Sequence, residues 1–200
     1  MKNMDLNSKI IREFVEFLEK RFSSNIVITE DSIRYDLFQC LNENGVNSTT
    51  MVLEFPHPSL PRHEVDLVVV SKTNSPEIAI ECKYDRKNKG GSNQNRTQRA
   101  GKLFQDIYKL KQIKKIYSNC RCFFIYITDD EMTHYLTREQ NSFGDFFVLK
   151  PHQVFEIHEN YLTFRADSFR DKLGDLFSCK LKCVANVNVL NNSLIIYEVL

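Results

Sequence analysis

Residues Glu77–Arg86 read EIAIECKYDR. This stretch begins with the apolar run IAI, as a buried strand does, and then places Glu81 and Lys83 on either side of Cys82. A charge on an apolar strand is costly unless it is paired, hydrated or bound to a metal. These two charges therefore need partners, which neighbouring segments must supply.

A second strand candidate, Glu64–Ser71, precedes this stretch and pairs with it as an antiparallel hairpin. The turn lies in Lys72–Pro76, and centring it on Thr73-Asn74 sets the register. One face is then apolar and pairs Val65 with Cys82, Leu67 with Ile80, and Val69 with Ile78. The other face pairs Asp66 with Glu81, Val68 with Ala79, and Glu64 with Lys83.

The second face brings two carboxylates together. Directly opposed residues have Cβ atoms roughly 4.5–5.5 Å apart, so Asp66 and Glu81 repel each other unless a proton, a cation or a metal ion intervenes. Lys83 lies two residues from Glu81 and shares its face. Two carboxylates and one ammonium leave a negative pocket suited to Mg²⁺, with Mn²⁺ as a substitute. The alternative is a plain cross-strand ion pair between Glu64 and Lys83.

The surrounding pattern predicts an α/β fold with a central mixed sheet flanked by helices, in the order α-β-β-β-α-β, followed by C-terminal strands. Glu30 opens the second helix and projects from its inward face, one turn before Ile33. The predicted helices are 8–22, 30–44, 96–115, one starting after the N-cap Asp129 and running to about 139, and one near 168–177. The predicted strands are 50–55, 64–71, 77–83 and 121–128, with a last pair of strands joined by a turn at Asn191-Asn192.

A basic segment follows the hairpin. Residues 83–115 carry 11 Lys or Arg and 2 Asp or Glu, although the whole chain has a net charge of only +1. Such a segment suits a polyanion, and the alternative is an ordinary solvated face. The residues expected to hold phosphates are Arg86, Lys87, Lys89, Arg96, Arg99 and Lys102.

The composition fits one domain. The chain has 200 residues, 42% hydrophobic and 26% charged, and no apolar run long enough for a membrane span. The first ten residues contain no signal-peptide core, and the six scattered cysteines are expected to be reduced and buried in a cytoplasmic protein. We expect an N-terminal helix in residues 1–29, a core in 30–128 and an extension in 129–200.

With these residues in place, the chain resembles the PD-(D/E)xK nuclease superfamily, which has the restriction-endonuclease-like fold. The resemblance rests on Asp66 in EVDLVVV, on Glu81 and Lys83 in IAIECKY, and on Glu30 in the helix before the first strand. It covers about half of the chain. Val65 stands where a proline often precedes the aspartate, at a position that varies in the superfamily.

The resemblance implies that Asp66, Glu81 and the main-chain carbonyl of Cys82 bind the metal. Lys83 would orient the attacking water or activate it, and activation requires a lowered lysine pKa. Glu30 would add a ligand or a water contact. The implied activity is Mg²⁺-dependent endonucleolytic hydrolysis of DNA, of a restriction, defence or mobile-element type, leaving 5′-phosphates.

Double-strand cleavage favours a homodimer, and the 129–200 extension would serve target recognition or dimer contacts. Two other functions stay open. One is a non-catalytic nucleic-acid-binding module that retains the nuclease fold. The other is a structural or partner protein whose charges form a salt-bridged core without a divalent metal.

Overall fold

The computed structural model describes residues 6–24, 26–85, 96–139, 143–163 and 176–200, with only the backbone described for residues 96–98 and 163. The helices are α1 (Ser8–Phe22), α2 (Glu30–Glu43), the 3₁₀ helix η1 (Ser48–Thr50), α3 (Arg96–Ile116), α4 (Asp130–Thr137), α5 (Gly144–Phe147) and α6 (Glu159–Thr163). The strands are β1 (Met51–Pro56), β2 (Glu64–Val70), β3 (Pro76–Asp85), β4 (Arg121–Asp129), β5 (Val154–Ile157), β6 (Cys179–Val189) and β7 (Asn192–Val199).

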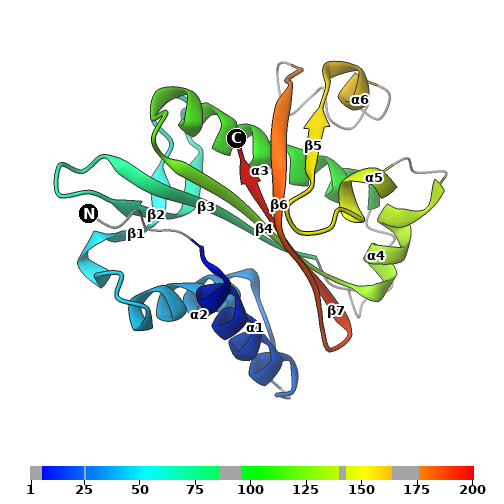
Figure 1. The fold of residues 1–200 in the computed structure, drawn as a ribbon, viewed down its shortest axis with the longest axis horizontal. Helices are drawn as coiled ribbons and strands as arrows, with labels where there is room; N and C mark the ends of the chain where they lie inside the picture. The colour runs from blue at the N-terminus through cyan, green and yellow to red at the C-terminus, as the bar shows by residue number, and fades with distance from the viewer. Residues whose placement is uncertain (1–5, 25, 86–95, 140–142, 164–175) are drawn as a thin grey trace.

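All seven strands form one mixed sheet with the order β1-β2-β3-β4-β7-β6-β5 (Figure 1). β3 and β4 are parallel, and α3 is the crossover helix that connects them. Every other neighbouring pair of strands is antiparallel. The predicted α/β class with a mixed sheet is therefore confirmed.

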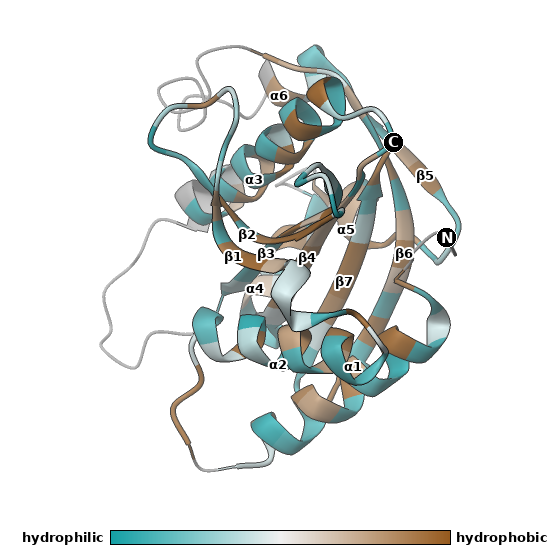
Figure 2. Cartoon of the chain, turned by 90° about the vertical axis from the view of Figure 1, so that its left-hand side faces the viewer, coloured by the Kyte–Doolittle hydropathy of each residue, from teal (hydrophilic) through white to brown (hydrophobic). Residues whose placement is uncertain are grey.

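Helices cover both faces of the sheet. Figure 2 shows α3 on one side and α1 with α2 on the other, with hydrophobic residues along the strands between them. One core cluster joins α3, α4 and α5 to the sheet through residues such as Phe104, Met132 and Phe146. The other joins α1 and α2 through residues such as Phe14 and Leu37. None of the described helices is long and apolar enough to cross a membrane.

The helix starts follow from local side-chain hydrogen bonds. Asn7 caps α1 by accepting from Lys9 N and Ile10 N. Thr29 and Ser32 form a reciprocal capping box that starts α2 and makes Glu30 its first residue. Asp129 accepts from Met132 N, which confirms it as the N-cap of α4.

The β2–β3 register is confirmed at Leu67–Ile80, Val68–Ala79 and Val69–Ile78. Towards the turn, a bulge between Val69 and Val70 shifts the pairing to Val70–Pro76. The predicted turn thus set the right register for the centre of the hairpin, although it did not foresee the bulge.

The placement of Val65 on the face of Leu67 and Cys82 is wrong. Val65 packs with Val68 in the α3-side cluster, whereas Leu67 and Cys82 belong to the α1/α2-side cluster. The paired residues of β2 and β3 begin only at Leu67–Ile80. Val65 lies beyond these pairs, so its side chain need not follow the alternation of sheet faces. The next residue, Asp66, accepts a hydrogen bond from Cys82 N at 2.7 Å.

The C-terminal strands join the central sheet. β6 and β7 are linked by a turn at Leu190-Asn191, one residue before the predicted turn, and β7 pairs with β4 along its whole length. Most of the helix predicted near Ser168–Phe177, residues 168–175, lies outside the described residues, and the described remainder, 176–177, is not helical. All six cysteines are free and buried, as expected.

Candidate active site

Charged side chains from four elements meet where β2 and β3 leave their common ladder. We call this set the charge cluster. Its carboxylates are Glu30 on α2, Asp66 on β2, Glu81 on β3 and Asp106 on α3, and its cations are Arg34 on α2, Lys83 on β3 and Lys109 on α3. Four of the seven members, Asp66, Glu81, Lys83 and Glu30, are the catalytic residues expected from the sequence.

Glu81 is the most buried member, with 1% of its surface exposed. Its Oε2 accepts a hydrogen bond from Lys109 Nζ at 2.7 Å. Its Oε1 is also buried and has no hydrogen-bond partner among the described residues. Burial, followed by the charges of Asp106 and Asp66, raises the pKa of Glu81 well above its usual value despite Lys109. The free oxygen is therefore a costly feature of the interior.

Asp66 uses both carboxylate oxygens. Its Oδ2 accepts from Cys82 N at 2.7 Å, and its Oδ1 accepts from Arg34 Nη1 at 3.1 Å. Burial raises the pKa of Asp66, and these two contacts only partly oppose that shift. The charge of Asp66 also contributes to the raised pKa of Glu81. The predicted direct pairing of Asp66 with Glu81 is not among the paired residues of β2 and β3, which begin at Leu67–Ile80.

Lys83 is held by Glu30 rather than by Glu64. Its Nζ donates to Glu30 Oε2 at 2.9 Å, and the same oxygen accepts from Tyr84 N at 3.0 Å. Burial is the largest single influence and disfavours the charge of Lys83, but the carboxylates of Glu30, Asp106 and Asp85 together outweigh it and raise the lysine pKa. This direction is opposite to the one that proton abstraction requires, so the arrangement favours an orienting ammonium.

Sequence reasoning missed Asp106 and Lys109. Lys109 Nζ contacts Asp106 Oδ1 at 3.0 Å as well as Glu81, and burial of Asp106 raises the pKa of its carboxyl. The available signal was weak: Asp106 is one of only two acidic residues in the basic segment 83–115, and it lies three residues before Lys109. The helical pattern assigned the inward face of α3 to apolar residues alone.

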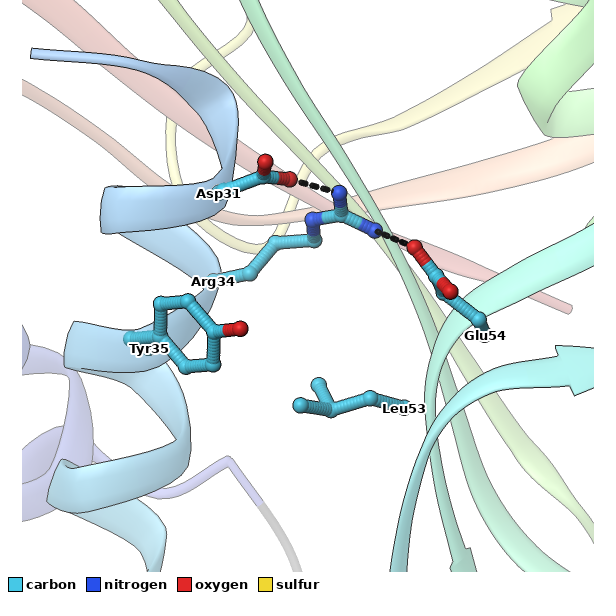
Figure 3. Close-up of a pocket in the computed structure, with 5 residues that line it drawn as sticks. All are labelled: Asp31, Arg34, Tyr35, Leu53 and Glu54. Carbon is cyan, nitrogen blue, oxygen red and sulfur yellow. Dashed lines mark hydrogen bonds and ion pairs between the residues drawn. The ribbon is translucent and has the colours of Figure 1, made fainter.

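Arg34 was also missed, because it lies beside the inward face of α2. It pairs with Asp31 on the same helix as well as with Asp66, and Glu54 Oε1 lies 4.0 Å away. Figure 3 shows the Arg34 side chain extending from α2 towards β1, between the carboxylates of Asp31 and Glu54.

The expected phosphate-binding residues are only partly described. Arg86, Lys87 and Lys89 lie outside the described residues, and for Arg96 only the backbone at the start of α3 is described. Lys102 is exposed on α3, whereas Arg99 is half-buried and lowers the pKa of Asp85 against the larger, opposite effect of burial. The binding role of these six residues stays a prediction.

One atom of the charge cluster is a candidate ligand for a hard divalent cation. Glu81 Oε1 is buried without a hydrogen-bond partner among the described residues, and Asp66 and the Cys82 main chain are its neighbours on the hairpin. Mg²⁺ is often held by one or two carboxylates and retains several waters. In the part of the chain that the structure describes, no group of three or more His, Cys, Asp or Glu side chains is placed to hold a metal ion.

Comparison of the chain with protein-family models, with curated proteins and with solved structures finds no match. The charge cluster itself therefore carries the functional argument.

Proposed function

We propose that the protein is a Mg²⁺-dependent DNA endonuclease built on a restriction-endonuclease-like core. The observation that carries this proposal is the charge cluster, where Glu81 Oε1 is buried without a hydrogen-bond partner among the described residues and Asp66 lies close by. A protein interior rarely leaves a carboxylate oxygen unsatisfied without a functional reason. A divalent cation, with Mn²⁺ as a substitute for Mg²⁺, would satisfy it.

The chain's own residues would divide the work. Asp66, Glu81 and the Cys82 carbonyl would hold the ion, which when bound supplies Lewis acidity and a more acidic water. Lys83 pairs with Glu30, and the carboxylates around it raise its pKa and so favour its ammonium form. An ammonium has three N–H donors, so beyond Glu30 it can orient a water or a phosphate oxygen for in-line attack.

DNA would be held by the basic segment next to the site. Lys102 is exposed near the start of α3, and Arg86, Lys87 and Lys89 lie between β3 and that helix in the sequence. Contacts to phosphates position the backbone without reading its sequence and make affinity fall with salt. A restriction-type or defence nuclease acting as a homodimer is the biological setting that we propose.

A second candidate is a non-catalytic nucleic-acid-binding module with the same fold. It is favoured by the internal pairing of the charge cluster, since Arg34, Lys83 and Lys109 each contact a carboxylate of the cluster. Such pairing keeps much of the charge compensated without a metal. This candidate predicts salt-dependent DNA binding without cleavage.

The test is incubation of the purified protein with supercoiled plasmid and Mg²⁺, beside an EDTA control. We expect nicked or linear plasmid with Mg²⁺ and none with EDTA. Asp66→Ala and Lys83→Ala should each lower the cleavage rate by at least about 100-fold. Lys72→Ala, an exposed lysine in the hairpin turn, is the matched control and should cleave normally.

Circular dichroism must show that each variant is folded. Salt-sensitive DNA binding with no cleavage under any metal condition would support the binding module instead. Cleavage that survives both Asp66→Ala and Lys83→Ala would show that the active site lies elsewhere.

A further inference from the structure

Arg34 stands at the boundary between the buried charge cluster and the surface. Its side chain is 16% exposed and contacts Asp66, which is 17% exposed, through Nη1 at 3.1 Å. The same guanidinium pairs through Nη2 with Asp31 and lies 4.0 Å from Glu54, and these two carboxylates are 63% and 64% exposed. One cation is thus shared between an inner carboxylate and two outer ones.

Glu54 reaches Arg34 through an unusual backbone conformation. Its φ is 53°, in the left-handed region that residues other than glycine seldom adopt within a strand. The flanking residues Leu53 and Phe55 are nevertheless paired with Leu67 and Val65 in the regular β1–β2 register. Strain of this kind is tolerated where the surrounding structure uses it. Here it accompanies the placement of a carboxylate beside Arg34.

A cavity lies next to Arg34. The cavity of about 210 Å³ lies between α2 and β1 and is lined by Asp31, Arg34, Tyr35, Leu53 and Glu54 (Figure 3). The close-up shows the guanidinium between Asp31 and Glu54. This cavity offers room beside the guanidinium.

A divalent ion at Asp66 would conflict with the present position of Arg34. Asp66 Oδ1 accepts from the guanidinium, and Oδ2 accepts from Cys82 N. An ion bound to that carboxylate would lie close to a full positive charge in a poorly hydrated site, where repulsion is strong. Either the ion binds weakly or Arg34 moves away from Asp66.

We propose that Arg34 is a positioning residue that compensates the charge of Asp66 until a divalent ion binds, and then transfers to Glu54. Asp31 holds the guanidinium during the exchange. The proposal rests on the proposed metal site and goes beyond it, because it assigns a function to Arg34 and to the strained Glu54. The binding free energy of the ion then includes the cost of breaking the Arg34–Asp66 pair and the gain from the Arg34–Glu54 pair.

The test measures Mn²⁺ affinity directly, by the electron paramagnetic resonance signal of free Mn²⁺ during titration, without any substrate. Arg34→Gln should bind Mn²⁺ roughly ten-fold more tightly, because the competing charge is gone. Glu54→Gln should bind it several-fold more weakly, because Arg34 loses the carboxylate to which it transfers, although Asp31 remains. The double variant should match Arg34→Gln, since Glu54 acts only through Arg34.

Arg12→Gln, an exposed arginine on α1, is the matched control and should leave the affinity unchanged. Unchanged or weaker Mn²⁺ binding by Arg34→Gln would overturn the role of Arg34. If Arg34→Gln fails to fold, Glu54→Gln decides alone, and undiminished Mn²⁺ binding by that variant overturns the proposal. Asp66→Asn separates the two levels: if wild-type binding does not depend on Asp66, the metal site itself is wrong.

Discussion

Glu81 carries a cost that the rest of the charge cluster does not remove. One oxygen is paired with Lys109, and the other is buried without a hydrogen-bond partner among the described residues. Leaving a buried polar group unsatisfied costs about 1–3 kcal/mol, and more for a charged group. Sites of catalysis often retain such costs, because the missing partner arrives with the cofactor or the substrate.

His57 fixes the β1–β2 loop to α3 in a single protonation state. Its Nε2 lies 3.0 Å from Lys109 O, and its Nδ1 accepts from Ser59 N and Leu60 N. Nδ1 must therefore be unprotonated and Nε2 must carry the hydrogen. Burial is the main reason why the pKa of His57 is lowered.

This histidine predicts a pH dependence of stability. The folded state binds the proton less readily than the unfolded state, whose histidine pKa is about 6.5. The contribution of His57 is therefore complete above that pH and is lost as the pH falls below it. Urea unfolding at pH 7.5 and 5.5 should show a smaller loss for His57→Asn than for the wild type. An equal loss of stability in the wild type and in His57→Asn would contradict this role of His57. The control is His63→Asn, at an exposed neighbouring histidine, which should behave like the wild type.

Strand alternation and one turn predicted the register at the centre of the hairpin correctly. They did not predict that Lys83 pairs with Glu30 or that Asp66 accepts from Cys82 N. The members of the charge cluster on the helices were harder to predict. Whether a helical side chain reaches the cluster depends on how far its helix extends over the sheet. Lys109 falls outside the apolar stripe of α3, yet it reaches Glu81 over the edge where β2 and β3 separate. In the sequence, Lys109 could therefore not be distinguished from the other basic residues of segment 83–115.

The second helix carries two members of the charge cluster on its first two turns. Glu30 is its first residue, and Arg34 follows one turn later. The capping box of Thr29 and Ser32 sets where the helix begins, with Ser32 N to Thr29 Oγ1 at 3.2 Å and Thr29 N to Ser32 Oγ at 2.9 Å. The cap therefore contributes to the position of Glu30 as well as to stability.

Thr29→Ala should lower the unfolding free energy by about 0.5–2 kcal/mol, the usual cost of losing an N-cap. It should also reduce DNA cleavage, because Glu30 positions Lys83. Asn7→Ala, which removes the cap of α1, is the matched control and should cost similar stability without the loss of cleavage. Equal cleavage rates in the two variants would show that the α2 cap has no special role in the site.

Helix and strand limits were predicted closely because they depend on local patterns. The first helix has the predicted bounds, and the strand around Glu81 is only slightly longer than expected. The bulge at Val69/Val70 and the left-handed Glu54 were not predicted, since both arise from how paired strands adjust to each other. Neither position has the glycine that usually marks such a feature.

At the scale of the whole molecule, the C-terminal region completes the sheet. β7 inserts between β4 and β6, so residues 192–199 are part of the same layer as the hairpin that carries Asp66 and Glu81. This pairing joins segments far apart in the chain, and nothing in a local pattern specifies it. A role of the 129–200 extension in recognition or dimerisation stays a prediction.

We propose that the charge cluster binds a divalent metal at Asp66 and Glu81. The most direct measurement is a crystal structure of the protein grown with Mn²⁺, with anomalous diffraction data to locate the ion. We predict an anomalous peak within about 2.5 Å of Glu81 Oε1 and an Asp66 oxygen, with none at this position in a Glu81→Gln crystal. An ordered charge cluster without a peak, at a Mn²⁺ concentration that supports cleavage, would contradict the claim.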